Sequence, residues 1–285
     1  MHVSLTAEPL THIGPLTVTN SLLTTWIVVF LITLFAIIFR LRIKKTPKGI
    51  QNIVEAVIEG FYGIVESVAE NPKLTRRFFA PIFTIFLFVL LNNWAGLIPG
   101  IGSIGILHAE TGEIHETENQ DSTEYNPVSH ETREEIGEHE SVENSQKEPS
   151  EHSPAFTPIF RPGTADLSFT LSLAIVAVLM VQFMGIRKLG AWRYFSRFLN
   201  FKNPVLFFVG LLEIVSEFSK MVSFSFRLFG NIFAGEVLLT VIISLAPFIA
   251  PMPFYGLEIF VGAVQALVFA MLTLVFFRMA TSEAH

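Results

Sequence analysis

The sequence predicts an all-α, polytopic membrane protein with about five transmembrane helices and one interfacial amphipathic helix, which ends in a long tilted helix hairpin. Three observations predict this fold class. Hydrophobic residues make up 51% of the 285 residues, Phe alone occurs 29 times, and the mean hydropathy is +0.54. Five apolar runs reach the roughly 20 residues that a helix needs to cross a hydrocarbon core. Lys and Arg collect at alternate ends of these runs, as in an oriented membrane protein.

The formal net charge of −6 is unevenly distributed along the chain. The segment from Glu110 to Glu151 holds 14 of the 25 acidic residues and only two basic ones, so the remainder is net basic, with 17 Lys and Arg against 11 acids. Cysteine is absent, which excludes disulfides and thiolate metal sites. No basic residue precedes the first apolar run. We therefore expect this run to remain as a membrane anchor rather than be cleaved as a signal peptide.

The basic clusters set the expected orientation, because Lys and Arg are retained on the cytoplasmic side. The first span, residues 20–39, ends at such a cluster (Arg40, Arg42, Lys44, Lys45 and Lys48), and we expect the two termini on opposite sides of the membrane. The sequence divides into six segments: 1–48, an external N-terminus and the first transmembrane helix; 49–75, a cytoplasmic interfacial helix; 76–105, a transmembrane helix; 106–162, an acidic, disordered external loop; 163–203, a transmembrane helix and a basic cytoplasmic loop; and 204–285, the long helix hairpin.

Two of these segments depart from a simple crossing. Residues 49–70 place apolar side chains at helical spacing on one face and four Glu on the other, which is typical of an interfacial helix.

The other segment is the long helix. After Pro204 no proline occurs until Pro247. A helix of that length spans roughly 60 Å, twice what a perpendicular crossing needs. This helix is therefore tilted, broken or partly outside the membrane.

The long helix carries charged and polar residues in an otherwise apolar setting: Glu213, Glu217, Lys220, Arg227, Asn231 and Glu236. A charge at mid-bilayer costs about 2.5–3.5 kcal/mol on insertion scales, so each needs a reason to be there. Arg227 stays protonated at any physiological pH. It therefore cannot relay a proton, but it can serve as a fixed positive charge that favours ionisation of a nearby carboxylate. Gly230 and Ala234 lie beside it and would let a partner helix approach closely.

The last helix pairs with the long one by position. Glu258 and Gln265 are seven residues apart and hence on one face. If the two helices fold back on each other at Pro247, each residue of one helix lies at the same depth as a residue of the other. The two residue numbers of every such pair then add up to nearly the same total. Gln265 is then level with Arg227, and Glu258 with Glu236. Two carboxylates close together in a low dielectric cannot both ionise cheaply, which favours a proton relay over the alternative of a protonated structural pair.

These residues carry a resemblance to a known family. The segment from Ser225 to Glu236, SFRLFGNIFAGE, together with residues 258–265 and the terminal MATSEAH, resembles subunit a of the F-type, or rotary, ATP synthase. The likeness is strong over about the last 80 residues and weaker through 162–185 and 92–99. The sequence differs from the family at Gly96, where relatives often have an acidic residue, and in the acidic loop. The resemblance therefore implies nothing about the role of this loop.

The resemblance implies a non-catalytic stator subunit in the inner membrane of a bacterial cell, with a cytoplasmic C-terminus and the acidic loop on the external or periplasmic side. Its partners would be the c-subunit ring, the peripheral-stalk b subunits, the lipid bilayer and protons, with no nucleic acid, cofactor or metal. Two aqueous half-channels would be separated by Arg227. The implied proton-translocation residues are Arg227, Asn231, Glu236, Glu258, Gln265, Glu213, Asp166, Ser168 and Asn93.

Other classes of function leave different marks in a sequence. A self-contained, ion-coupled secondary transporter would show an internal repeat with interrupted helices in matching halves, whereas this chain has one polar hairpin. A structural scaffold does not explain the intramembrane charges. The alternative for Glu213 is a solvated position on the helix, with its side chain extending to the membrane surface.

No Walker-type phosphate loop is present. The histidines of the acidic loop fit no metal-ligand spacing, and the sequence leaves H⁺ and Na⁺ as alternatives.

Overall fold

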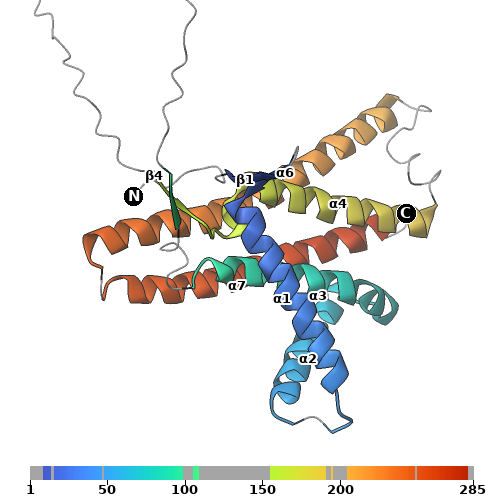
Figure 1. Cartoon of the computed structure of the whole chain (residues 1–285). Helices are drawn as coiled ribbons and strands as arrows, with labels where there is room; N and C mark the ends of the chain where they lie inside the picture. Colours follow the sequence, from blue (N-terminus) through green and yellow to red (C-terminus); the bar gives the residue numbers. More distant parts are fainter. Residues whose placement is uncertain are drawn as a thin grey trace, which may run out of the picture. The chain divides into compact units, whose positions relative to one another are not determined.

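The structure is a computed structural model that describes residues 9–13, 16–46, 48–98, 105–108, 155–190, 194, 204–247 and 249–281. Within these ranges, five helices are long and apolar enough to cross a membrane, which confirms the predicted fold class. They are α1 (Asn20–Arg42), α3 (Pro72–Ala95), α4 (Leu167–Leu189), α6 (Pro204–Leu245) and α7 (Pro251–Thr281), drawn in Figure 1.

Helix α1 begins with polar side chains that are buried and continues with apolar ones that are exposed. Thr19 caps its N-terminus, where the Thr19 Oγ1 accepts a hydrogen bond from the Leu22 N–H at 3.4 Å. Its first turns bury Asn20, Ser21, Thr24 and Thr25. The following turns expose large apolar side chains such as Phe30, which indicates a lipid or protein partner for this surface.

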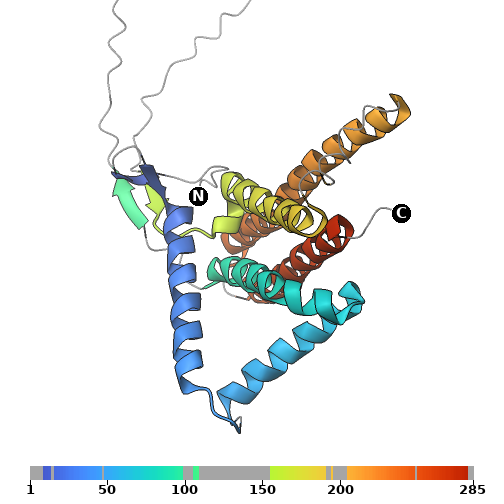
Figure 2. The ribbon, with the colours of Figure 1, turned by 90° about the vertical axis from the view of Figure 1, so that its right-hand side faces the viewer.

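Helix α2 (Ile50–Ala69) is amphipathic, and only its C-terminal half packs on the other helices. Phe61 and Val65 join a core cluster with side chains of α3, α4 and α7. The N-terminal half leaves apolar side chains such as Ile53 exposed. The helix ends at Glu70, which has left-handed backbone geometry (φ 51°). Figure 2 shows that α1 and α2 meet at the short connection between them and then diverge.

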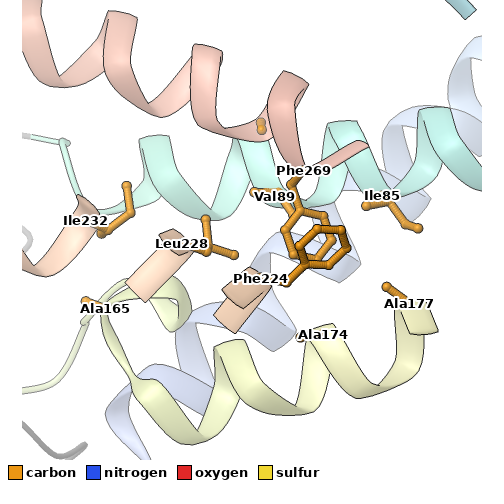
Figure 3. Close-up of a cluster of buried hydrophobic side chains, with 10 residues drawn as sticks. Ile85, Val89, Ala165, Ala174, Ala177, Phe224, Leu228, Ile232 and Phe269 are labelled. Carbon is orange, nitrogen blue, oxygen red and sulfur yellow. The ribbon is translucent and has the colours of Figure 1, made fainter. Parts of the chain in front are cut away.

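Helices α3, α4, α6 and α7 pack around two apolar clusters. The first cluster brings Phe224 and Leu228 of α6 against Phe269 of α7, with small side chains from α4 completing it (Figure 3). The second cluster contains Phe78 of α3 stacked on Phe277 of α7, with ring centroids 4.9 Å apart. This core fixes the depth of the polar side chains on α6 and α7 relative to one another.

Two short strand pairs were not expected from the helical pattern. β1 (Pro9–Ile13) and β2 (Leu16–Thr19) pair antiparallel immediately before α1. The strands β3 (Gly105–His108) and β4 (Ala155–Pro158) form the second pair. Residues 109–154 of the predicted disordered loop lie outside the described residues.

The end of the predicted loop differs from the expectation. Residues 158–162 belong to the helical unit, and the short 3₁₀ helix η2 (Gly163–Ala165) follows them. Arg161 is only 5% exposed. A segment expected to be solvated is therefore packed, because its backbone and side chains find polar partners on α1 and α6.

The predicted long helix is a single helix of 42 residues, so of the three alternatives the break does not occur. Figures 1 and 2 show that α6 runs at a large angle to α1. The chain turns back after α6, and Pro251 begins α7 at its first position, where proline is tolerated because its missing N–H has no partner in a helix anyway.

Candidate functional site

The α6–α7 hairpin has the register that the sequence predicts. Phe224 and Phe269 have ring centroids 5.0 Å apart. A Cβ added to Gly235 would lie 2.3 Å from the Glu258 carboxyl atoms. The two residue numbers of each of these pairs add up to 493. The expected pairs have almost the same totals, 492 for Arg227 with Gln265 and 494 for Glu236 with Glu258. Gln265 therefore lies near the depth of Arg227, and Glu258 near the depth of Glu236.

Arg227 lies on the exposed face of α6. Within the part of the chain that the structure describes, its guanidinium has no hydrogen-bond or ion-pair partner. Gly230 and Ala234 are exposed beside it, and a Cβ on Gly230 would meet nothing within 4 Å. The predicted approach surface for a partner helix is therefore open. Asn231 is half-buried at the edge of this face.

A groove of about 260 Å³ leads along α6 to Arg227. Three serines of α6 and the Lys220 side chain make it polar on one side, and α7 supplies an apolar wall. The Lys220 Nζ lies 4.7 Å from the centre of the Phe276 ring, a cation–π contact. The lining residues are Ser216, Ser219, Lys220, Ser223, Phe224, Arg227, Leu272 and Phe276.

Glu217 of α6 makes polar contacts with Lys220 on the same helix and with α4. The Glu217 carboxylate accepts hydrogen bonds from Lys220 Nζ at 2.5 Å and from Gln182 Nε2 of α4 at 2.8 Å. The Tyr194 hydroxyl donates to Gln182 Oε1. Glu213, one turn before Glu217, is half-buried. These hydrogen bonds connect Glu217 and Lys220 of α6 to α4.

Glu236 has a different partner from the one that the depth argument suggested. Its Oε2 atom accepts a hydrogen bond from Nη2 of Arg161 at 3.3 Å, and the two groups form an ion pair. The Glu236 side chain is 33% exposed, whereas that of Arg161 is 5% exposed. Although Glu236 and Glu258 are close in depth, no hydrogen bond joins these two described residues.

Glu258 is buried on α7, at 7% exposure, and has no hydrogen-bond or ion-pair partner among the described residues. Two further buried amides lie near it. Asn93 Nδ2 donates to the Gly262 carbonyl at 2.9 Å, between Glu258 and Gln265 along α7. Asn93 Oδ1 and Gln265 Nε2 are both buried without a protein partner in the described part of the chain. Buried polar atoms of this kind usually bind water, so this side of α7 is suited to a hydrated path.

Asp166 and Ser168 lie at the N-terminus of α4. Asp166 is the N-cap: its Oδ1 accepts from the Ser168 N–H at 3.0 Å, and its Oδ2 accepts from the Ser21 hydroxyl of α1 at 3.2 Å. The Ser168 side chain is exposed. These contacts give Asp166 a clear role in joining two helices.

Sequence reasoning missed Arg161 and Gly235. Arg161 is followed by Pro162 and Gly163, which indicated a loop. It is nevertheless the last basic residue before the span that begins at Leu167. An isolated cation that close to an apolar run would have been a usable signal. Gly235 lies within the motif that carries the resemblance, but its role depends on which helix faces it.

The fold and the site define an α-helical, multi-pass membrane protein whose two longest helices carry four carboxylates and the exposed Arg227 within membrane-spanning segments. The chain matches the model of the family described as "ATP synthase A chain" over residues 22–278. It therefore belongs to this family.

Bacterial proteins named "ATP synthase subunit a" are similar to this chain over most of its length. The protein from Moorella thermoacetica is 28% identical over 265 residues, covering 93% of this chain and 92% of the relative. The protein from Gloeobacter violaceus is 31% identical over 266 residues, covering 92% and 84%. The protein from Campylobacter jejuni subsp. jejuni serotype O:23/36 is 30% identical over 264 residues, covering 90% and 89%.

Proposed function

We propose that this chain is the non-catalytic, proton-conducting stator subunit of a rotary ATP synthase, in which Arg227 separates two half-channels that serve carboxylates of a c-subunit ring. The observation that carries this proposal is the position of Arg227. Its guanidinium lies on an open face of a membrane-spanning helix and has no counter-ion in the described part of the chain. A permanent charge in that setting is stabilised by an anion from beyond the described residues. A carboxylate on a passing rotor helix would supply it.

The two half-channels use groups on opposite sides of Arg227. On one side lie Glu236, Glu258 and Asn93, while Gln265 lies near the depth of Arg227. Asn93 and Gln265 have buried atoms suited to water. Asp166 and Ser168 would open this outer path at the start of α4. On the other side, the groove from Ser216 to Arg227 would form the inner path, with Glu213 near its entrance and Asn231 beside the arginine.

The same proposal implies an orientation of the chain in the membrane. The basic end of α1 would be cytoplasmic, as would the C-terminus, in the inner membrane of a bacterial cell. Residues 106–162 would then be external or periplasmic. The large angle between α1 and α6 supports a tilted α6 that follows the ring. The exposed apolar surface of α1 is available for lipid or for the b subunits of the peripheral stalk.

Cross-linking tests the proposed rotor face directly, because the chain has no cysteine of its own. Gly230→Cys places a thiol on the open face beside Arg227, and Val29→Cys places one on the exposed apolar face of α1. In membranes that contain the assembled complex, a thiol cross-linker should join position 230, but not position 29, to cysteines on c subunits. Cross-linking at position 29 alone would contradict the proposal.

A reconstitution experiment separates the stator from a self-contained transporter. Purified chain in liposomes should show no ion uptake beyond that of empty liposomes, because the proposed path is completed only by the ring. Uptake by the chain alone at the rate of a transporter would overturn the stator assignment.

A further inference from the structure

The connection between α1 and α2 carries basic side chains next to exposed apolar ones. We call residues 40–46 and 48–54 the elbow, whose cations are Arg40, Arg42, Lys44, Lys45 and Lys48. We propose that the elbow binds an anionic phospholipid, with the lipid phosphate held by these cations and the acyl chains lying on apolar side chains at the start of α2. This lipid site lies outside the α6–α7 hairpin and is independent of the function proposed above.

The five cations of the elbow are exposed and have no counter-ion in the part of the chain that the structure describes. No acidic residue occurs in the sequence between Glu8 and Glu55, so the cations also lack acidic neighbours along the chain. Like charges this close repel one another, and an anion that contacts several of them relieves the repulsion. A cluster of four to eight Lys or Arg at the end of a membrane-spanning helix is typical of binding to anionic lipids.

The acidic segment of the chain leads back to the opposite end of α1. Pro158 follows this segment, and its carbonyl accepts a hydrogen bond from Asn20 Nδ2 at 3.2 Å. Asn20 begins α1, whereas the elbow includes its last turn. With α1 across a membrane, these two ends lie on opposite sides. The elbow therefore needs a different anion.

The length of α1 puts the elbow at the depth of the lipid phosphates. The helix has 23 residues, or roughly 35 Å at 1.5 Å per residue, against about 30 Å for the hydrocarbon core. Its last turn carries Arg40 and Arg42 and therefore reaches the headgroup layer. Lys and Arg side chains extend to phosphate from such a position, and one arginine can bind two phosphate oxygens at once.

Hydrogen bonds from one side chain hold the backbone of the elbow in place. Gln51, in the first turn of α2, accepts a hydrogen bond from the Lys44 N–H at 3.0 Å and donates one to the Lys44 carbonyl at 2.8 Å. Gly49 makes the sharp turn into α2 with a φ of 61°, which favours glycine. The backbone that carries Lys44 is thus attached to α2, so less conformational entropy is lost when the cations converge on one phosphate.

The apolar side chains at the start of α2 are not covered by the described residues. Ile50, Ile53 and Val57 are each more than half exposed. They continue the helical stripe that includes Phe61 and Val65, which are buried against α3 and α7. An acyl chain along this stripe would replace that packing. A phospholipid matches both features, because one molecule joins a phosphate to apolar chains, whereas a soluble anion matches the cations alone.

Photoreactive lipids test this site in the assembled complex. The complex is placed in nanodiscs of phosphatidylcholine with a trace of either phosphatidylglycerol or phosphatidylcholine that carries the same photoreactive acyl chain, and labelled residues are mapped by mass spectrometry. Phosphatidylglycerol should label residues 40–57 about tenfold more or better, because each cation near the surface contributes about fivefold to the binding of anionic lipid. High salt should lower this preference towards one, whereas inorganic phosphate, which has no acyl chain, should leave it unchanged.

Charge variants locate the binding at the elbow. The combination of Lys44→Gln, Lys45→Gln and Lys48→Gln should lower the preference for phosphatidylglycerol by about tenfold or more, whereas arginine at the same three positions should keep it. The matched control removes three exposed cations at the start of α3 and leaves the elbow intact; it combines Lys73→Gln, Arg76→Gln and Arg77→Gln. This control should be labelled like the wild type.

Several results would overturn the proposal. In the wild type, these are equal labelling by the two lipids, a preference that survives high salt, or displacement of phosphatidylglycerol by inorganic phosphate. Labelling by neither lipid would show that a protein subunit covers the elbow instead. Among the variants, they are an unchanged preference in the glutamine triple variant or an equal loss in the control. The wild-type series needs no variant to assemble, and none of these readouts depends on proton pumping, so the stator proposal is tested separately.

Discussion

Glu258 of α7 packs directly on Gly235 of α6, so closely that a Cβ on the glycine would lie 2.3 Å from the carboxyl atoms. This contact sets the separation of the two helices at one depth, as Phe224 and Phe269 do at another. It also places the buried carboxyl group between the helices of the hairpin that carries Arg227. The position of Glu258 thus depends on the absence of a side chain on the neighbouring helix.

Replacing Gly235 with alanine should therefore move the Glu258 carboxyl group rather than the helices. The added methyl group meets the far end of a flexible side chain, which can rotate at small cost, and alanine has the higher helix propensity, so stability should change by less than about 1 kcal/mol. ATP-driven proton pumping by the assembled complex should fall, because the carboxyl group is displaced. Gly256→Ala is the matched control on α7: a Cβ there meets nothing within 4 Å, so both stability and pumping should be kept. Equal pumping by the two variants would contradict the packing described here.

Substitution of Asp166 separates capping from proton transfer. Asp166→Ala removes the N-cap and the hydrogen bond from Ser21, and it should lower stability by about 0.5–2 kcal/mol. Asp166→Asn keeps a capping oxygen but cannot carry a proton. If Asp166 acts through the cap alone, the asparagine variant should pump normally, whereas a direct role in the outer path requires it to pump poorly with normal stability.

The contact between α2 and α7 should respond to acid. Arg278 Nη2 donates to Glu70 Oε2 at 2.5 Å, and this hydrogen bond together with the arginine charge lowers the pKa of Glu70 below its usual value. Because the pKa is lowered in the folded state, the contact is fully present at neutral pH and is lost as the pH falls through that lowered pKa. The protection factor against hydrogen exchange at the last turn of α2, which corrects for the slower intrinsic exchange in acid, should therefore fall as the pH is lowered.

Glu70→Gln provides the control for this pH response. Its neutral amide cannot titrate, so exchange in the last turn of α2 should lose this acid-dependent step. Arg278 Nη1 also donates to the Val68 carbonyl at 3.0 Å, and this bond should keep α2 attached in the variant. An unchanged acid response in Glu70→Gln would mean that another group controls this end of α2.

The sequence predicted the spans and the hairpin register because both follow from simple periodic constraints. A hydrocarbon core demands apolar runs of about 20 residues, and two antiparallel helices advance equally along their axes. Arg161 was not predicted, because a single arginine between Pro and Phe carries no periodic signal. Its side chain pairs with Glu236, which is 75 residues away in the sequence. The polar first turns of α1 were missed for the same reason, since their partners lie in the segment before η2, on α3 and at the N-cap of α4.

The Arg227 environment was predictable in part. The sequence indicated a permanent intramembrane charge beside small residues, and the structure adds that this face is open and that the arginine has no counter-ion in the described ranges. Helical spacing alone could not distinguish the packed Glu217 and Lys220 from the exposed Arg227. That difference depends on Gln182 of α4, which contacts Glu217, and on Phe276 of α7, which contacts Lys220.

The most direct test of the central claim is ATP-driven proton pumping in membrane vesicles that carry Arg227→Ala, with assembly of the full complex measured in the same vesicles. The stator account predicts a normally assembled complex that does not pump, because the exposed Arg227 side chain is not needed for packing but is needed to separate the two half-channels. An assembled complex that pumps near the wild-type rate would contradict the account and favour a structural role for this chain.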